Sequence, residues 1–237
     1  EVGNLFGLGD VTLGMFALPI TVLAVIGAIN AFNMVDGIDG LLGGLSLVTF
    51  SGIAVLMKLN GQEDKYYLCV IFVVTMLPYI MMNLGLIGKE RRVFMGDAGS
   101  MMIGFTVVWL LLSASQTNAV DVSIRPVTCL WLIALPLMDM ASIMVRRIRK
   151  GKSPFKPDRE HLHHIFQRLG FSSRQTLVII CGFASLFALM GILGELYKVT
   201  EYLMFYSFIV LFLIYNYLLQ HVWTITGSLK KQIQGED

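Results

Sequence analysis

Long uncharged runs alternate with short polar gaps along the whole chain. One run, 126–145, contains a single charged residue, Asp139. A helix of about 20 apolar residues crosses the hydrocarbon core of a bilayer, so each run predicts a membrane span. We therefore expect an all-α polytopic bundle of about seven spans, forming one integral-membrane domain over residues 1–237. The other six runs lack Lys, Arg, Asp and Glu altogether: 11–35, 40–57 (short and glycine-rich, the weakest candidate), 66–87, 98–120, 175–194 and 202–220.

Composition agrees with a membrane protein and excludes several other classes. Of 237 residues, 56% are hydrophobic and 14% are charged, against about 25% charged in soluble domains. Disorder requires low hydrophobicity, and a disulfide scaffold requires more than three cysteines, all of which lie here inside apolar runs. The net charge of +2 is too small to favour a nucleic-acid-binding protein.

Basic residues are divided unequally between the two sets of gaps that alternating spans create. The set with 1–10 and 58–65 carries four Lys and Arg, and the set with 88–97 and 146–174 carries fourteen. The positive-inside rule places the second set in the cytoplasm. An odd number of spans then leaves the N-terminus outside, with the loop 146–174 and the tail 224–237 inside.

A first polar cluster lies at the cytoplasmic end of the first span, in the sequence NAFNMVDGIDG over 30–40. Asp36 and Asp39 are three residues apart, so on a helix they would share one face. Polar groups at this depth are costly and usually functional. A plain Asp-Gly turn is the alternative, although two Asp-Gly pairs preceded by Asn30 and Asn33 fit it less well.

A second cluster, VFMGDAGS over 93–100, precedes another span. Glycines on both sides of Asp97 allow close approach of the backbone to a ligand. Asp and Ser also cap helices, and on this segment alone metal binding and capping remain equally open.

A third cluster, PDREHLHH over 157–164, contains three of the four histidines in the chain. On a helix, His161 and His164 would share a face. No cysteine lies nearby and no HExxH motif is present, which weakens a zinc hypothesis. Imidazoles among arginines suit an anionic substrate better.

All three clusters fall on the side that the Lys and Arg distribution makes cytoplasmic. Carboxylates can hold Mg²⁺, which takes oxygen ligands together with substrate phosphates, and the basic residues and histidines can hold the remaining charge of a polyphosphate. The sequence therefore predicts a metal-assisted site for a phosphorylated substrate at the inner face of a membrane. Asp139 either faces this site or hydrogen-bonds a neighbouring helix.

Together these segments resemble the polyprenyl-phosphate N-acetylhexosamine-1-phosphate transferases. The resemblance implies transfer of GlcNAc-1-phosphate from UDP-GlcNAc to undecaprenyl phosphate with release of UMP, in a bacterial inner membrane, with Mg²⁺ or Mn²⁺ as cofactor. The reaction would begin O-antigen, enterobacterial common antigen or a related envelope polysaccharide. A different UDP-N-acetylhexosamine remains an alternative. The matching segments are NAFNMVDGIDGLLGGLS (30–46), VFMGDAGS (93–100), WLIALPLMDM (131–140) and RKGKSPFKPDREHLHH (149–164).

The resemblance also implies a role for each site residue. Asp97 would be the first metal ligand and Asp39 the second, with Asp36 beside them as a further catalytic carboxylate. Asn33 would orient these groups and Phe94 would stack on uracil. The remaining expected residues are His161, His163 and His164 on the substrate phosphates, and Asn83 and Arg159 in substrate binding.

One departure from the family pattern concerns an adjacent Asp-Asp pair on an earlier cytoplasmic loop. This sequence contains no Asp-Asp, and it has seven predicted spans where the family has ten or more. We therefore expect that an N-terminal part is missing and that the 237 residues alone are inactive.

Three other classes fit the sequence less well. A secondary transporter binds its substrate near the midplane, whereas these clusters lie at one surface. A membrane aspartyl protease reads Gly-x-Gly-Asp, but position 94 is Phe. A CDP-alcohol phosphotransferase needs a longer series of aspartates. The sequence does not specify an oligomeric state.

Overall fold

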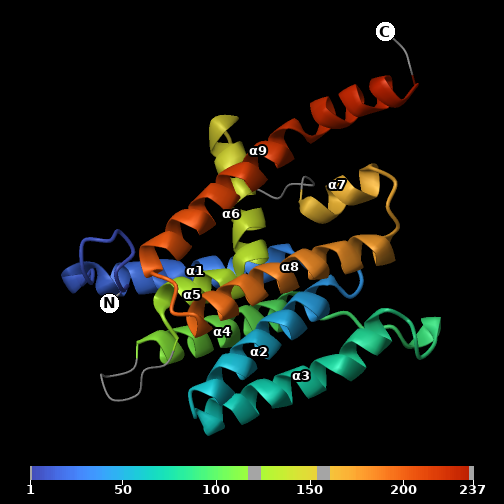
Figure 1. The fold of residues 1–237 in the computed structure, drawn as a ribbon. Coiled ribbons are helices and arrows are strands. Elements are labelled where there is room, and N and C mark those ends of the chain that lie inside the picture. Colours follow the sequence, from blue (N-terminus) through green and yellow to red (C-terminus); the bar gives the residue numbers. More distant parts are fainter. Residues whose placement is uncertain (1, 117–123, 154–160, 235–237) are drawn as a thin grey trace.

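The computed structural model describes residues 2–116, 124–153 and 161–234, and within these ranges every regular element is a helix (Figure 1). The expected all-α bundle is therefore confirmed for the described residues. Six helices are long and apolar enough to cross a membrane. The α-helices are α1 (Ala17–Met34), α2 (Leu41–Leu59), α3 (Glu63–Asn83), α4 (Gly96–Ser115), α5 (Pro126–Leu132), α6 (Ala134–Arg149), α7 (Leu162–Arg168), α8 (Ser173–Leu196) and α9 (Glu201–Gln234), with short 3-10 turns at Gly14–Phe16 and Lys89–Arg91.

The predicted span 126–145 differs from the others, because it is broken at Ile133 into α5 and α6, which meet at 82°. Pro136 explains the break: it has no N–H for the carbonyl of Leu132, and its ring would clash with that carbonyl in a continuous helix. The Thr49 hydroxyl of α2 donates to the Leu132 carbonyl at 3.3 Å instead. The predicted span 126–145 is therefore two helices and not one continuous helix. Figure 1 shows α6 running across the direction of the other long helices.

The bent pair nevertheless connects the two ends of the bundle. Arg125, just before α5, donates to the carbonyl of Val199, just before α9. Arg149, at the end of α6, donates to Gln220, far along α9, at 2.9 Å. The pair thus contacts the connection before α9 and again Gln220 within α9. Counted as one broken span, it brings the number to seven.

The core is centred on α2, which packs against α3 on one side and α8 on another. Two-thirds of its apolar window is buried, against 17% for α1 and for α3. Many large apolar side chains of the other helices remain exposed, as expected for surfaces that face lipid. Helices α1 and α4 approach closely at Gly104, where a Cβ would lie 2.8 Å from the Ile29 Cα.

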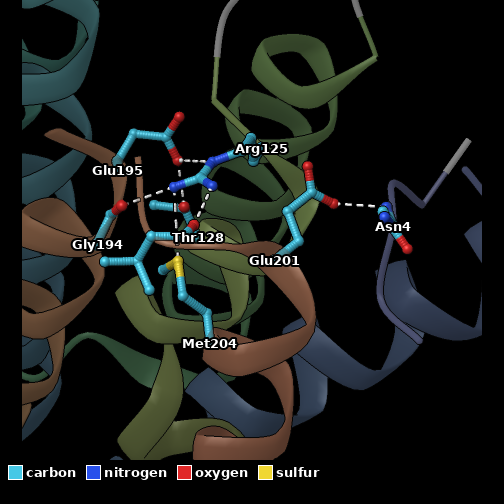
Figure 2. A network of polar contacts seen from close by, with 8 residues as sticks. Asn4, Arg125, Thr128, Gly194, Glu195, Glu201 and Met204 are labelled. Carbon is cyan, nitrogen blue, oxygen red and sulfur yellow. Dashed lines mark hydrogen bonds and ion pairs between the residues drawn. The ribbon is translucent and has the colours of Figure 1, made fainter. Parts of the chain in front are cut away.

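A partly buried polar network closes one end of the bundle, which we call the Arg125 end (Figure 2). The Arg125 guanidinium donates to the Glu195 carboxylate at 3.1 Å and to the carbonyls of Gly194 at 2.7 Å and Val199 at 2.5 Å. The Thr128 hydroxyl donates to the same carboxylate. This network fastens the start of α5 to the connection between α8 and α9, and the aspartates of the first two polar clusters lie at the opposite end.

Candidate functional site

Asp36 and Asp39 lie in the turn between α1 and α2, not on a helix. The expectation that they share a helical face is therefore wrong. Gly40 explains why the helix is interrupted, because its φ of +82° is a left-handed conformation that favours glycine. The turn is also held from outside: the buried Asn83 side chain accepts from the Gly40 N–H at 2.5 Å and donates to the Val93 carbonyl at 2.8 Å. Asn83 thus ties together the two segments that carry aspartates.

Asp97 lies in the first turn of α4 and faces the end of α1. The N-cap residue of α4 is Met95, and Asp97 follows in the first turn. A carboxylate there interacts favourably with the helix dipole. The Asn33 amide of α1 donates to Asp97 at 3.4 Å and to the Ser100 hydroxyl at 2.8 Å. The predicted orienting role of Asn33 has a geometric basis in this bridge.

The three aspartates lie close enough to influence one another. The pKa of the Asp36 carboxyl is raised, first because the surrounding protein removes hydration and then because Asp97 and Asp39 are negatively charged. Asp39 forms an ion pair with Arg92 at 2.9 Å, which neutralises part of the local charge. We call the end of the bundle that carries Asp36, Asp39 and Asp97 the aspartate end.

The aspartate end can be tested for its fit to a divalent cation. Among the described residues, no three Asp, Glu, His or Cys side chains converge on one point. Mg²⁺ usually needs one or two carboxylates, because waters and substrate phosphates supply its other oxygen ligands. Asp97 and Asp39 offer hard oxygen donors of this kind, and their negative charges contribute, after burial, to the raised pKa of Asp36. The donor set fits Mg²⁺ or Mn²⁺, and metal binding stays a prediction.

The histidine cluster adopts a different geometry from the one expected. His161 is the residue before α7 and not part of the helix, so it does not share a helical face with His164. Its Nδ1 lies 3.0 Å from the carboxylate of Asp139 on α6. The rings of His161 and His163 are parallel with centroids 5.6 Å apart, and His164 follows at 4.2 Å from His163.

His163 connects this cluster to the aspartates. A methyl group at Gly37, next to Asp36, would overlap the Nε2 atom of His163, so the ring packs directly against the turn. The ring is 2% exposed. Its Nε2 has no hydrogen-bond partner among the described residues. Burial lowers the pKa of His163 to about 4, with further lowering by His164 and His161. The imidazole is therefore neutral at physiological pH.

Two other predicted residues have different outcomes. Phe94 is 73% exposed, two residues after Arg92, so its ring is accessible to a planar ligand. Arg159 lies outside the described residues, as do 154–158 and Glu160.

Asp139 is the residue whose place the sequence left open. It is 3% exposed and contacts both His161 and a neighbouring helix, where the Tyr215 hydroxyl of α9 donates to it at 3.0 Å. An isolated acid inside an apolar run could have indicated such a network, because burial requires partners. Tyr215 gave no comparable indication, since it is one of several tyrosines in its run.

Comparison with known proteins gives a consistent family. Residues 1–115 match the model of glycosyl transferase family 4. Over 98% of its length, the chain is similar to proteins named undecaprenyl-phosphate alpha-N-acetylglucosaminyl 1-phosphate transferase. It is 49% identical to the one from Yersinia pestis, 50% to the one from Haemophilus influenzae and 48% to the one from Escherichia coli K12.

The chain spans 63% to 65% of the length of these relatives. Similarity extends over 232 residues, which include the aspartate turn, the start of α4 and the histidine cluster. The family match thus covers residues 1–115, and the similarity to these transferases extends over nearly the whole chain.

Proposed function

We propose that the full protein transfers GlcNAc-1-phosphate from UDP-GlcNAc to undecaprenyl phosphate, giving undecaprenyl-diphospho-GlcNAc and UMP. The observation that carries this proposal is the convergence of Asp36, Asp97 and His163 at one end of a membrane bundle. The printed names of the relatives supply the substrates. In the reaction, an oxygen of the lipid phosphate bonds to the phosphorus that carries the sugar, and the bond from that phosphorus to UMP breaks.

The carboxylates serve this reaction as an anchor for the diphosphate. Asp97 and Asp39 would hold Mg²⁺ or Mn²⁺, which when bound neutralises charge on the diphosphate and on the departing UMP. Asn33 keeps Asp97 turned toward the α1 end by its hydrogen bond. Arg92 pairs with Asp39 and would supply a further positive charge for the phosphates.

The remaining site residues face the nucleotide. Neutral His163 offers its Nε2 as a hydrogen-bonding group beside the aspartate turn, and His164 lies next to it. The exposed Phe94 ring offers a stacking surface for uracil. Asn83 supports this arrangement from behind, and its direct contact with substrate stays a prediction, as does that of Arg159.

The location follows from charge. Fourteen of the 18 Lys and Arg residues belong to the gaps on the same side as these clusters, which favours a cytoplasmic site on the inner membrane of a bacterium. UDP-sugars are made in the cytoplasm, so this orientation gives the donor direct access. The product lipid would serve O-antigen, enterobacterial common antigen or a related polysaccharide.

The test measures UMP release by the full-length protein in membranes supplied with UDP-GlcNAc, undecaprenyl phosphate and Mg²⁺. Asp97→Asn should lower the rate by at least about 100-fold, because it removes a charged group that acts on the diphosphate. Asp64→Asn is the matched control, since Asp64 is also in the first turn of a spanning helix but is exposed at the other end. Equal rates for Asp97→Asn and wild type would contradict the proposal.

A further inference from the structure

Asp139 is a buried carboxylate of α6 whose two oxygens contact three groups on α9 and at the start of α7. Its Oδ2 lies 3.0 Å from His161 Nδ1, and its Oδ1 accepts from the Leu162 N–H at 3.1 Å and from the Tyr215 hydroxyl at 3.0 Å. The carboxylate is 3% exposed. A buried carboxylate needs this many donors to offset its lost hydration.

These bonds determine which nitrogen of His161 carries a proton. The backbone N–H of Leu162 can only donate, so Asp139 Oδ1 acts as an acceptor. A carboxylate that accepts on both oxygens requires a donor at His161, and that donor is Nδ1–H. The same carboxylate thus sets the tautomer of the ring, as carboxylates do for histidines in many active sites.

The bond to Leu162 has a second consequence, for the position of α7. Leu162 is the first residue of this helix, and its N–H is one of the donors without a partner inside the helix. Asp139 accepts this N–H and so fixes where α7 begins. His163 is the next residue, and its ring packs against Gly37 of the aspartate turn. The position of His163 relative to the aspartates therefore depends on Asp139.

We propose that Asp139 is a positioning residue, which keeps His161 in the Nδ1–H form and anchors the first turn of α7 so that His163 stands against the aspartate turn. The expected effect on kcat rests on the proposed transferase function, whereas the tautomer of His161 and the anchoring of α7 do not depend on it. Asp139 reaches the reaction only through His161 and His163.

The first experiment measures the tautomer directly. Full-length protein labelled with ¹⁵N-histidine is examined by NMR at a pH of about 8, where an ordinary imidazole is neutral, and His161→Gln assigns the His161 signals. We expect a proton on Nδ1 of His161. An unprotonated Nδ1 would overturn the proposal. The spectrum needs neither substrate nor a variant at Asp139, so it decides the point even if the transferase function fails or Asp139→Asn does not fold.

The second experiment separates positioning from mere stability. Asp139→Asn keeps the shape and can still accept from Leu162, but its amide would donate to His161 and force the proton onto Nε2. We expect kcat for UMP release to fall about 10- to 100-fold, as for other partners that orient a site histidine. KM for UDP-GlcNAc should stay within about twofold, because the residue does not touch substrate.

The matched control is Glu195→Gln, which makes the same acid-to-amide change in the partly buried network at the Arg125 end. It should leave kcat unchanged. Wild-type kcat in Asp139→Asn, with the His161 proton moved to Nε2, would overturn the proposal, as would equal loss of kcat in both variants. A wild type that releases no UMP would refute the transferase function and leave the NMR result standing.

Discussion

Two carboxylates, the partly exposed Glu195 and the buried Asp139, hold opposite ends of this bundle together, and they differ in their partners. Glu195 pairs with Arg125, whose charge is permanent, and the remaining guanidinium N–H groups reach backbone carbonyls. Asp139 pairs with His161, whose charge and tautomer depend on its surroundings. Both networks fix a broken helix in place, but only the one at Asp139 uses a group that can move a proton.

The two ends of the bundle also differ in how far their polar groups are paired. At the Arg125 end, the Glu195 carboxylate accepts from the Arg125 guanidinium and the Thr128 hydroxyl, and the guanidinium also donates to two backbone carbonyls. At the aspartate end, Asp36 lies near two other negative charges, and the buried Nε2 of His163 has no partner among the described residues. Unsatisfied groups persist where function maintains them. The contrast separates a network that stabilises the fold from the proposed site.

The largest effect should follow from Gly37→Ala. The added methyl group would overlap His163 Nε2 and displace the ring from the aspartate turn. A displacement of about 1 Å in a site costs about 100-fold in rate, so UMP release by the full-length protein should fall by about this factor. Gly182→Ala is the control, because nothing lies near its Cβ position. An active Gly37→Ala variant would show that the contact is dispensable.

The next effect is on stability at the Arg125 end. Arg125→Gln leaves Glu195 without its cation and removes hydrogen bonds to two carbonyls. Because the pair is partly exposed, we expect a loss of about 2 kcal/mol in the free energy of unfolding, measured in detergent by thermal unfolding. The kcat of the folded fraction should not change. A lowered kcat would mean that the two ends are coupled and would weaken the contrast between them.

A smaller effect should appear as a pH dependence at His163. The unfolded chain protonates this imidazole near pH 6.5, whereas burial lowers the pKa in the folded protein to about 4. The folded state is therefore fully favoured above pH 6.5 and loses stability as pH falls from 6.5 toward 4. In His163→Gln this part of the slope should disappear, as measured by thermal unfolding across that range. An unchanged slope would assign it to other groups.

The smallest effect should come from Arg92→Gln. This side chain pairs with Asp39 at the surface, with about a third of each side chain exposed. Such pairs contribute less than about 1 kcal/mol, so the unfolding temperature should barely move. If Arg92 serves the phosphates, KM for UDP-GlcNAc should rise instead. If neither the unfolding temperature nor KM changed, the only role left for Arg92 would be that of a cytoplasmic positive charge that sets the orientation in the membrane.

The sequence predicted most of the fold because a bilayer imposes a length and an apolar character on each span. The break at Ile133 was not predicted, because Pro136 alone does not show whether a helix breaks. Pro78, by contrast, lies inside α3 without ending that helix. Whether a proline kinks or breaks a helix depends also on a partner for the carbonyl that it leaves without a hydrogen bond. Here that partner is Thr49, which lies on another helix.

The same limit applies to the site. The sequence identified Asp36, Asp39, Asp97 and the histidines, because each belongs to a short cluster of polar residues that are close in sequence. Two relations depend on how distant helices cross and were not predictable: the pairing of Asp39 with Arg92, and the anchoring of α7 by Asp139.

The break at Ile133 also bears on how the protein is made. Helix α5 has seven residues, which extend for only about 10 Å, and α6 carries Asp139 as well as three arginines in its last turn. Neither half inserts readily by itself. The polar partners of both halves, among them Glu195 and Tyr215, are synthesised later. We therefore expect this crossing to be completed only after α8 and α9 have left the ribosome, so that the last two helices act as an intramolecular chaperone for the one before them.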